Sequence, residues 1–343
     1  METFAYSYYQ FRPAEHNLTS EWDFLYNKAH NEYLNYLSTT GIVGFGTYLL
    51  VIGAFLVYCI KYLVLSIKQK IHNTYYIILT TALLASYTSY LIYNFFLFSV
   101  VILAVFFYLF PALVFVVTDS TRPLTSNFKY LTSHFSLLTS ILYRRPLYTK
   151  IAKGIVIFST LYLLYSIFQL WYADTIFNLG QKASDSGNPG RAYNFLTIAS
   201  QLNKAEPFYR SELAYSAAAA AAALSGTDAS LSAELKDQTI LEMEKVLNES
   251  PKNVSYARTA IRTYFELASL DKIYIDKTLE MLDRAISLAP TDPKLYYNKA
   301  LILQSMDKNE EAVEVLKKAL QLKPNYLQVK EQLKEATASG TKN

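Results

Sequence analysis

The sequence predicts an all-α protein in which a four-helix transmembrane region is followed by an α-solenoid of helix pairs. Three observations support this fold class. Hydrophobic residues make up 52% of the 343 residues and charged residues only 17%, and the apolar residues are concentrated in the first half. Residues 71–118 contain no Asp, Glu, Lys or Arg. The second half is charged, and its apolar positions recur at the spacing of a helical repeat of about 34 residues.

Four apolar segments are long enough for bilayer-spanning helices, which need roughly 20 residues. We expect spans at about 42–67, 75–93, 97–117 and 151–172, so that the transmembrane region occupies 42–172. The uncharged stretch is too long for one crossing, so a turn is expected at Asn94. Pro111 should kink the third helix. Trp171 and Tyr172 at the end of the fourth span are typical of an interfacial aromatic belt.

Loop charge predicts the orientation of these spans. The loop between the third and fourth spans, taken together with Lys153 at the start of the fourth span, holds six basic residues and one acidic residue, and three lysines flank the loop between the first and second spans. The positive-inside rule places both basic loops in the cytoplasm. Residues 1–41 and the C-terminal half then both lie outside the membrane, because four crossings return the chain to its starting side.

Residues 173–338 are predicted to form a repeat domain of the tetratricopeptide type. The last repeat carries the spacing of that helix–turn–helix unit most fully, and its positions are Pro293, Tyr296, Ala300, Leu303, Ala312, Leu316, Ala319 and Pro324. Weaker matches precede it, so we expect about four repeats over 173–326 and a terminal helix at about 327–336. The alanine run 217–223 is interpreted as a tightly packed helix. Such arrays bind extended ligands, which predicts a protein partner.

The outer segment 1–41 contains the residues best suited to chemistry. His30-Asn31-Glu32-Tyr33-Leu34 is followed by Gly41-Ile42-Val43-Gly44 and then by the first apolar segment. Histidine readily exchanges a proton near neutral pH, so beside a membrane it suggests action on a membrane-delivered substrate. The alternative is a capped helix start with a solvated histidine. Residues 1–27 show no signal-peptide pattern, so the chain is expected to be part of a longer membrane protein or of a split one.

These residues resemble the signature of the O-antigen ligase and polymerase family, over about residues 1–117. The resemblance implies a multi-pass glycosyltransferase of the bacterial cytoplasmic membrane. Such enzymes transfer a glycan from a polyprenyl pyrophosphate carrier to an acceptor, a glycan or a protein, on the outer face. Full members have many more membrane helices than the four expected here. They often carry a glutamate where this chain has Thr39.

The same resemblance implies roles for individual residues. His30 would be the catalytic residue, accepting the proton of the attacking acceptor hydroxyl. The leaving pyrophosphate needs positive charge, for which family members also use arginines from earlier parts of the chain that are absent here; within this chain Arg12 is the best local candidate for a second catalytic residue, and Lys28 is the second candidate for binding the pyrophosphate. Asn31 and Tyr33 would complete the substrate-binding set. No cofactor is expected.

Other functional classes find little support in the sequence. The histidines lack the spacing of a metal pair, so no metal site is expected. There is no glycine-rich phosphate loop, and the basic loops fit topology and anionic lipid better than nucleic acid. The alternative to the enzyme is a non-enzymatic, membrane-anchored scaffold whose repeats recruit an envelope protein.

Overall fold

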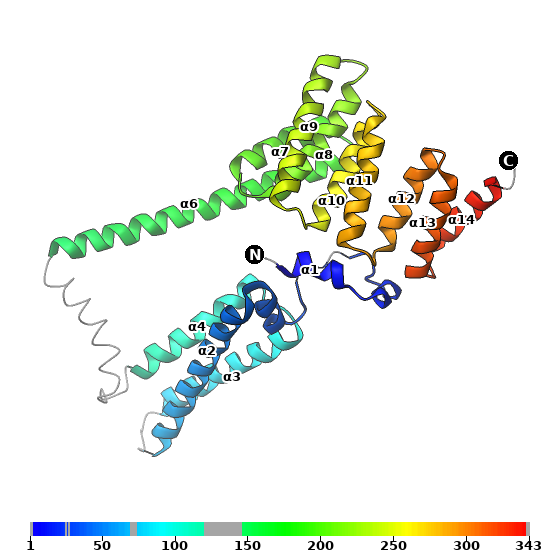
Figure 1. The fold of residues 1–343 in the computed structure, drawn as a ribbon. Coiled ribbons are helices and arrows are strands. Elements are labelled where there is room, and N and C mark those ends of the chain that lie inside the picture. Colours follow the sequence, from blue (N-terminus) through cyan, green and yellow to red (C-terminus); the bar gives the residue numbers. More distant parts are fainter. Residues whose placement is uncertain (1–2, 25, 27, 69–73, 120–145, 341–343) are drawn as a thin grey trace. The chain divides into compact units, whose positions relative to one another are not determined.

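The computed structural model describes residues 3–24, 26, 28–68, 74–119 and 146–340, and all regular structure within these ranges is helical (Figure 1). The chain divides into two compact units. The first comprises Met1–Phe4 and Tyr26–Phe158, and the second comprises Ala5–Leu25 and Ser159–Asn343. Most of the predicted basic loop, including Arg122, Lys129, Arg144 and Arg145, lies outside the described residues.

The first unit is built on α2 (Glu32–Lys68), α3 (Thr74–Phe96) and α4 (Val101–Asp119), which pack on one another. Aromatic side chains fill the space between them: Tyr48 stacks on Phe107 with ring centroids 5.1 Å apart, and Phe55 meets Tyr87 edge-on at 4.6 Å. Offset and edge-on arrangements of this kind are favoured by the charge distribution of the rings. The three helices therefore form one small bundle.

Four helices are long and apolar enough to cross a membrane. They are Glu32–Ile67, Thr74–Phe96, Val101–Thr118 and Lys153–Asp185. At most 28% of any of the apolar windows is buried inside the protein, and none of the last window is. Apolar side chains that face outward in such numbers are unfavourable in water and favourable against lipid.

Gly41 breaks α2 into two helical stretches. Its backbone angles are φ 69° and ψ −173°, a conformation that residues with a Cβ rarely adopt. A Cβ at Gly44 would also lie 2.2 Å from Thr40 Oγ1 across this break. The two glycines of the Gly-Ile-Val-Gly sequence therefore permit a kink between the short first stretch of α2 and its long apolar stretch.

The second unit is a stack of helix pairs. The C-terminal end of α6 (Pro146–Asp185) pairs with α7 (Pro189–Leu202), and Gly180 lets α6 approach α7, because a Cβ there would lie 2.7 Å from Leu196 Cγ. Three further pairs and a terminal helix follow: α8 (Pro207–Leu224) with α9 (Ala229–Glu249), α10 (Val254–Leu267) with α11 (Ile273–Leu288), α12 (Pro293–Ser305) with α13 (Asn309–Leu322), and α14 (Leu327–Gly340).

Local sequence accounts for the starts of these helices. Asn188, Glu206, Asp228, Asn253 and Asp292 each precede a helix, and each side chain accepts a hydrogen bond from a backbone N–H of the first turn. Proline occupies the first turn of α7, α8 and α12, where its missing N–H costs nothing. Each cap satisfies a backbone donor that the helix leaves unpaired.

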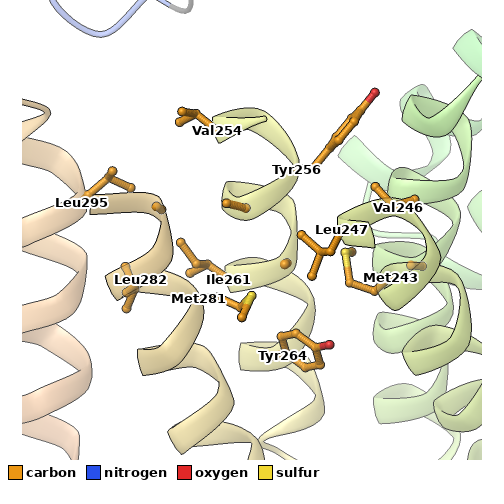
Figure 2. Packing of buried hydrophobic residues seen from close by; sticks show 14 of the residues in the cluster. Met243, Val246, Leu247, Val254, Tyr256, Ile261, Tyr264, Met281, Leu282 and Leu295 are labelled. Atoms are coloured by element: carbon orange, nitrogen blue, oxygen red, sulfur yellow. The ribbon is translucent and has the colours of Figure 1, made fainter. Parts of the chain in front are cut away.

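Buried apolar side chains join one pair to the next. Figure 2 shows the central cluster, where residues of α9, α10, α11 and α12 interlock; it includes Met243, Val246, Leu247, Ile261, Tyr264, Met281, Leu282 and Leu295. The alanine run of α8 is also buried, and Ala217 and Ala221 pack with Leu235 of α9. The interpretation of that run as a closely packed helix is confirmed.

A short N-terminal stretch belongs to the repeat unit. It comprises α1 (Thr3–Phe11) from Ala5 onwards and the 3-10 helix η1 (Ala14–Leu18), and Tyr9 is buried in the central cluster of the repeats. We call residues 5–24 the strap. The segment 1–41, expected to act as one outer loop, is thus divided between the two units: the strap belongs to the second, and the residues around His30 to the first.

Candidate functional site

The first helices of three successive pairs form a groove of about 470 Å³. Residues from α8, α10 and α12 line it, and they are Phe208, Glu212, Ser255, Arg258, Thr259, Ile261, Arg262, Lys294, Leu295 and Asn298. The lining therefore includes three cations and one carboxylate. It also combines polar and apolar side chains, which suits an extended chain with side chains of both kinds.

Two arginines of α10 are held in place within this groove. Arg262 Nη2 donates to Glu212 Oε1 at 3.0 Å, and its Cζ lies 4.5 Å from the centroid of the Tyr215 ring. Its side chain is nevertheless 51% exposed, so part of the guanidinium faces solvent. Arg258 forms an ion pair with Asp292, and burial lowers the pKa of Arg258. The groove thus presents cations whose positions are fixed in advance.

A second groove of about 250 Å³ adjoins the first and is mostly apolar. It shares Ile261, Arg262 and Asn298 with the first groove, and it adds Phe265, Thr278, Leu282, Leu301 and Ile302. Phe265 and Leu301 are exposed. The cationic groove therefore continues into a surface suited to large apolar side chains.

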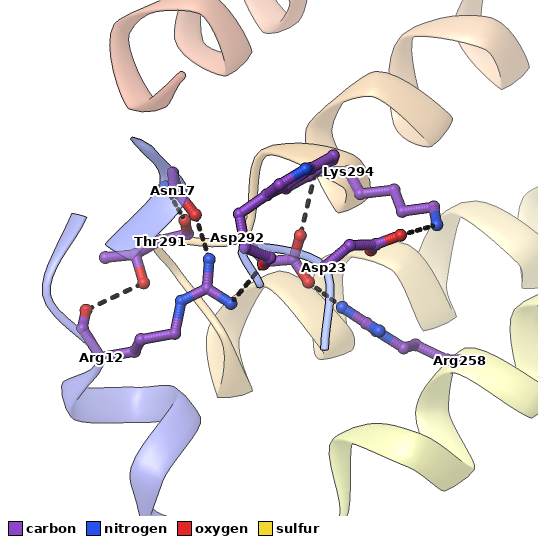
Figure 3. A network of polar contacts seen from close by, with 8 residues as sticks. Arg12, Asn17, Asp23, Arg258, Thr291, Asp292 and Lys294 are labelled. Carbon is purple, nitrogen blue, oxygen red and sulfur yellow. Dashed lines mark hydrogen bonds and ion pairs between the residues drawn. The ribbon is translucent and has the colours of Figure 1, made fainter. Parts of the chain in front are cut away.

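The strap is fixed to the turns between repeats by polar contacts (Figure 3). Asn17 is fully buried, and its Nδ2 donates to Thr291 O at 2.8 Å and to Leu322 O at 3.1 Å. Thr291 Oγ1 donates to Arg12 O at 3.0 Å. Within the strap, the Arg12 guanidinium donates to Asn17 Oδ1 and to Trp22 O. The amide of Asn17 thus connects the α11–α12 turn with the α13–α14 turn.

Lys323 and Tyr326 also contact the strap, at Asn17 and Trp22. Lys323 Nζ donates to Asn17 O at 2.6 Å and lies 4.5 Å from the Trp22 ring centroid, a cation–π contact. Burial lowers the pKa of Lys323. Trp22 also meets Tyr326 edge-on at 5.2 Å. Burial, with the nearby charge of Asp23, raises the pKa of Tyr326 to about 12.

The strap also reaches the cationic groove. Asp23 Oδ2 lies 2.7 Å from Nζ of Lys294, one of the residues that line it. Their side chains are 40% and 45% exposed, respectively. Figure 3 shows the Asp23 carboxylate between Lys294 and the Arg258–Asp292 pair. A carboxylate of the chain itself is thus bound at the edge of the groove.

The sequence-predicted site lies in the first unit, at the turn between α3 and α4. His30 is exposed, and its ring centroid lies 5.5 Å from that of Phe98 and 6.0 Å from that of Tyr26. Lys28, two residues earlier, is half-buried. The exposed imidazole thus lies against two aromatic rings.

The residues after His30 serve to fix the start of α2. Asn31 Oδ1 accepts from Leu34 N at 3.0 Å, and Asn31 Nδ2 donates to Phe95 O at 2.7 Å. Tyr33 OH donates to Leu91 O at 3.1 Å. Glu32 is buried, and its Oε2 accepts from Ser99 N at 3.0 Å, just before α4 begins. A carboxylate at the N-terminal end of a helix is favoured by the helix dipole.

The structure places the two predicted catalytic residues in different units. His30, Asn31 and Tyr33 come together in the first unit, whereas Arg12 is 4% exposed and belongs to the strap on the repeats. Within the described residues no group of three or more histidine, cysteine or acidic side chains could hold a metal ion.

Comparison with known proteins bears on the repeats. Residues 293–326 match the family model of the tetratricopeptide repeat. That match covers α12, α13 and the turn that follows, where the predicted spacing is fullest. The match supports tetratricopeptide repeats in this chain and does not extend to the apolar half, where the resemblance to O-antigen ligases finds no support among the comparisons.

Several solved structures are similar to part of the chain. A thermophilic tetratricopeptide protein from Thermus thermophilus, TTC0263, is 18% identical, with a TM-score of 0.37; the match covers 49% of this chain and 82% of that one. MamA 41-end from Desulfovibrio magneticus RS-1 is 19% identical over 50% and 92% of the two chains, with a TM-score of 0.34. YrrB, a tetratricopeptide protein with an unusual peptide-binding site, is 14% identical over 46% and 90%, with a TM-score of 0.21. No curated protein matches the sequence.

Proposed function

We propose that this chain is a non-enzymatic, membrane-anchored scaffold whose repeats recruit an envelope protein by binding an extended, acidic segment of it. One observation carries the proposal: three cations line the groove on α8, α10 and α12, and ion pairs with Asp292 and Glu212 hold two of them, Arg258 and Arg262, in place. Four apolar helices long enough to cross a bilayer would anchor the repeats to the membrane.

The charge and shape of the groove favour an acidic segment with large apolar residues. Guanidinium groups bind carboxylates through paired N–H donors, and Arg262 keeps part of its guanidinium in solvent. Asn298 offers an amide that can pair with an extended backbone. The adjoining apolar groove, with exposed Phe265 and Leu301, would accept apolar side chains next to the acidic ones. Together these features favour acidic peptides over basic or uniformly polar ones.

Peptide binding to the full chain in a lipid nanodisc tests this proposal. The probe is a fluorescein-labelled peptide of alternating aspartate and leucine, and its asparagine–leucine counterpart is the control probe. We expect only the acidic probe to bind. Arg262→Ala should weaken its binding by roughly tenfold, because an ion pair in a partly buried groove contributes on the order of 1–2 kcal/mol.

Lys317→Ala provides a matched control. Lys317 lies on α13 outside the groove, where it pairs with Glu314 at 2.6 Å. Its replacement removes one positive charge from the same domain and should leave binding unchanged. Equal binding of the two probes, or equal loss in the Arg262 and Lys317 variants, would contradict the proposal.

A second candidate is the glycan transfer implied by the O-antigen ligase resemblance. Its support is local: His30 is exposed, and the next residue, Asn31, binds the backbone of Phe95, which lines an apolar groove of about 340 Å³ together with Tyr33, Thr88, Leu91, Ile92 and Phe96. In this candidate the isoprenoid carrier lies in that groove, and His30 takes the proton of the acceptor hydroxyl.

Glycan transfer in native membranes separates the two candidates. The measurement is the incorporation of radiolabelled sugar from the pool of lipid-linked precursors into an acceptor. If the chain is a glycosyltransferase, His30→Ala should abolish incorporation, whereas His16→Ala, which removes a half-buried histidine from the strap, should preserve it. Unchanged transfer in the His30 variant would eliminate this candidate and leave the scaffold.

A further inference from the structure

Asp23 of the strap already occupies part of the groove. Its carboxylate binds Lys294, which lines the groove with Arg258 and Arg262, and its charge acts on Arg258 as well. The strap thereby places a carboxylate on Lys294. Arg258 pairs with Asp292, Arg262 with Glu212 and Lys294 with Asp23, so each cation that lines the groove has a carboxylate partner.

The ion pair with Lys294 is not what holds the strap in place. Both side chains are about half exposed, and ion pairs of that exposure contribute little to stability. The buried anchors lie elsewhere: Asn17 binds carbonyl groups of two inter-repeat turns, and Trp22 packs between Lys323 and Tyr326. Anchoring and charge compensation are therefore carried by different residues of the strap.

We infer that Asp23 is an internal competitor: it occupies Lys294 in the same way as a carboxylate of the partner would, and a partner segment must displace it. The inference rests on the proposed function of the groove and adds its regulation. It makes the affinity of the groove for acidic segments depend on a residue of the strap.

Replacing Asp23 with asparagine separates competition from anchoring. In the full chain in a nanodisc, Asp23→Asn should bind the aspartate–leucine probe roughly three- to fivefold more tightly, as expected when an exposed ion pair no longer competes. The gain should vanish in a Lys294→Ala background, because the two substitutions act on one contact. Asp283→Asn is the matched control, since Asp283 pairs with Lys299 outside the groove.

Tryptophan fluorescence reports on the anchor at the same time. Trp22 and Trp171 are the two tryptophans, so a Trp171→Phe background leaves Trp22 as the single fluorophore. Acrylamide should quench Trp22 equally in the parent and in Asp23→Asn, which shows that the strap has stayed in place. Asn17→Ala should increase quenching and should also raise probe affinity.

The outcomes distinguish this inference from the proposed function. If the acidic probe binds the parent and the Asp23 and Asn17 variants equally, the competition is overturned and the scaffold function remains. If no variant binds the probe, the proposed function fails, and a labelled peptide of residues 5–24 then tests the strap. That peptide should bind an Asn17→Ala, Trp22→Ala double variant and not the parent; binding to both or to neither overturns the inference.

Discussion

Asn17 is the most constrained polar residue of the strap. Its side chain is fully buried, and its two amide hydrogens are donated to Thr291 O and Leu322 O, while its own backbone oxygen accepts from Lys323. Thr291 lies in the turn between α11 and α12, and Leu322 is the last residue of α13, where carbonyl groups have no partner within the helix. Asn17 therefore satisfies acceptors that the repeats alone leave open.

Replacing Asn17 with alanine should loosen the strap. The substitution leaves buried carbonyl oxygens without a donor, which costs about 1–3 kcal/mol. Hydrogen exchange of the full chain should become faster in peptides from residues 5–24 and unchanged in α8 and α9. Asn309→Ala, which removes an exposed amide at the start of α13, is the control. Unchanged protection of the strap would contradict the role given to Asn17.

At the scale of elements, the turns within helix pairs differ in how well their residues suit the backbone. Gly187 follows α6 with φ 71°, and Asp307 follows α12 with φ 61°. Both occupy the left-handed position that ends many helices and favours glycine. The turn after α6 therefore has glycine, the residue that this conformation favours. The turn after α12 has aspartate, whose Cβ makes the same conformation less favourable.

Substitutions at these two positions should have opposite effects. Asp307→Gly removes a strained left-handed residue and should slow hydrogen exchange in α12 and α13, by an amount worth about 0.5–1 kcal/mol. Gly187→Ala introduces the strain and should speed exchange in α7 by a similar amount. If the two substitutions change the hydrogen-exchange rates in the same direction, the conformation of these turns does not control the stability of the adjoining helices.

At the scale of the molecule, the sequence predicted features that depend on local patterns. The four apolar helices follow from segments of sufficient length without charge, and the repeats follow from small residues such as Ala300 and Ala312 at fixed spacing. The all-α fold class is confirmed. These features were accessible because each is encoded within a few tens of residues.

The strap and the groove were not predicted, because their contacts are distant in sequence. Asn17 and Trp22 meet residues about 300 positions later, and no periodicity marks the strap. Arg12 was assigned to catalysis from its place near His30 in the chain, whereas its guanidinium binds Asn17 and Trp22 within the repeat unit. One sequence feature distinguishes the residue that the strap contacts. Lys323 follows α13 at the position where Ala289 follows α11 in the preceding repeat.

The terminal helix α14 should be required for the strap to remain in place. Tyr326 and Val329 belong to the cluster that closes the stack, and Trp22 packs against it. A chain that ends at Leu322 removes that surface, and terminal capping elements protect repeat arrays. Hydrogen exchange should then rise in the strap and in α13, while α8 and α9 keep their protection. A chain that ends at Ala338 should behave like the parent, and loss of protection throughout the stack would contradict this assignment.

The contact between Asn17 and Lys323 also has a consequence for the order of synthesis. The two residues are 306 positions apart, and a ribosome adds about 5–20 residues per second. Asn17 and Trp22 therefore emerge roughly 15–60 s before the surface that covers them exists. During that interval the side chains of Asn17 and Trp22 remain accessible to other proteins. Insertion factors or chaperones can therefore bind the strap before the repeats do. The strap can dock only after Lys323 and Tyr326 have been synthesised.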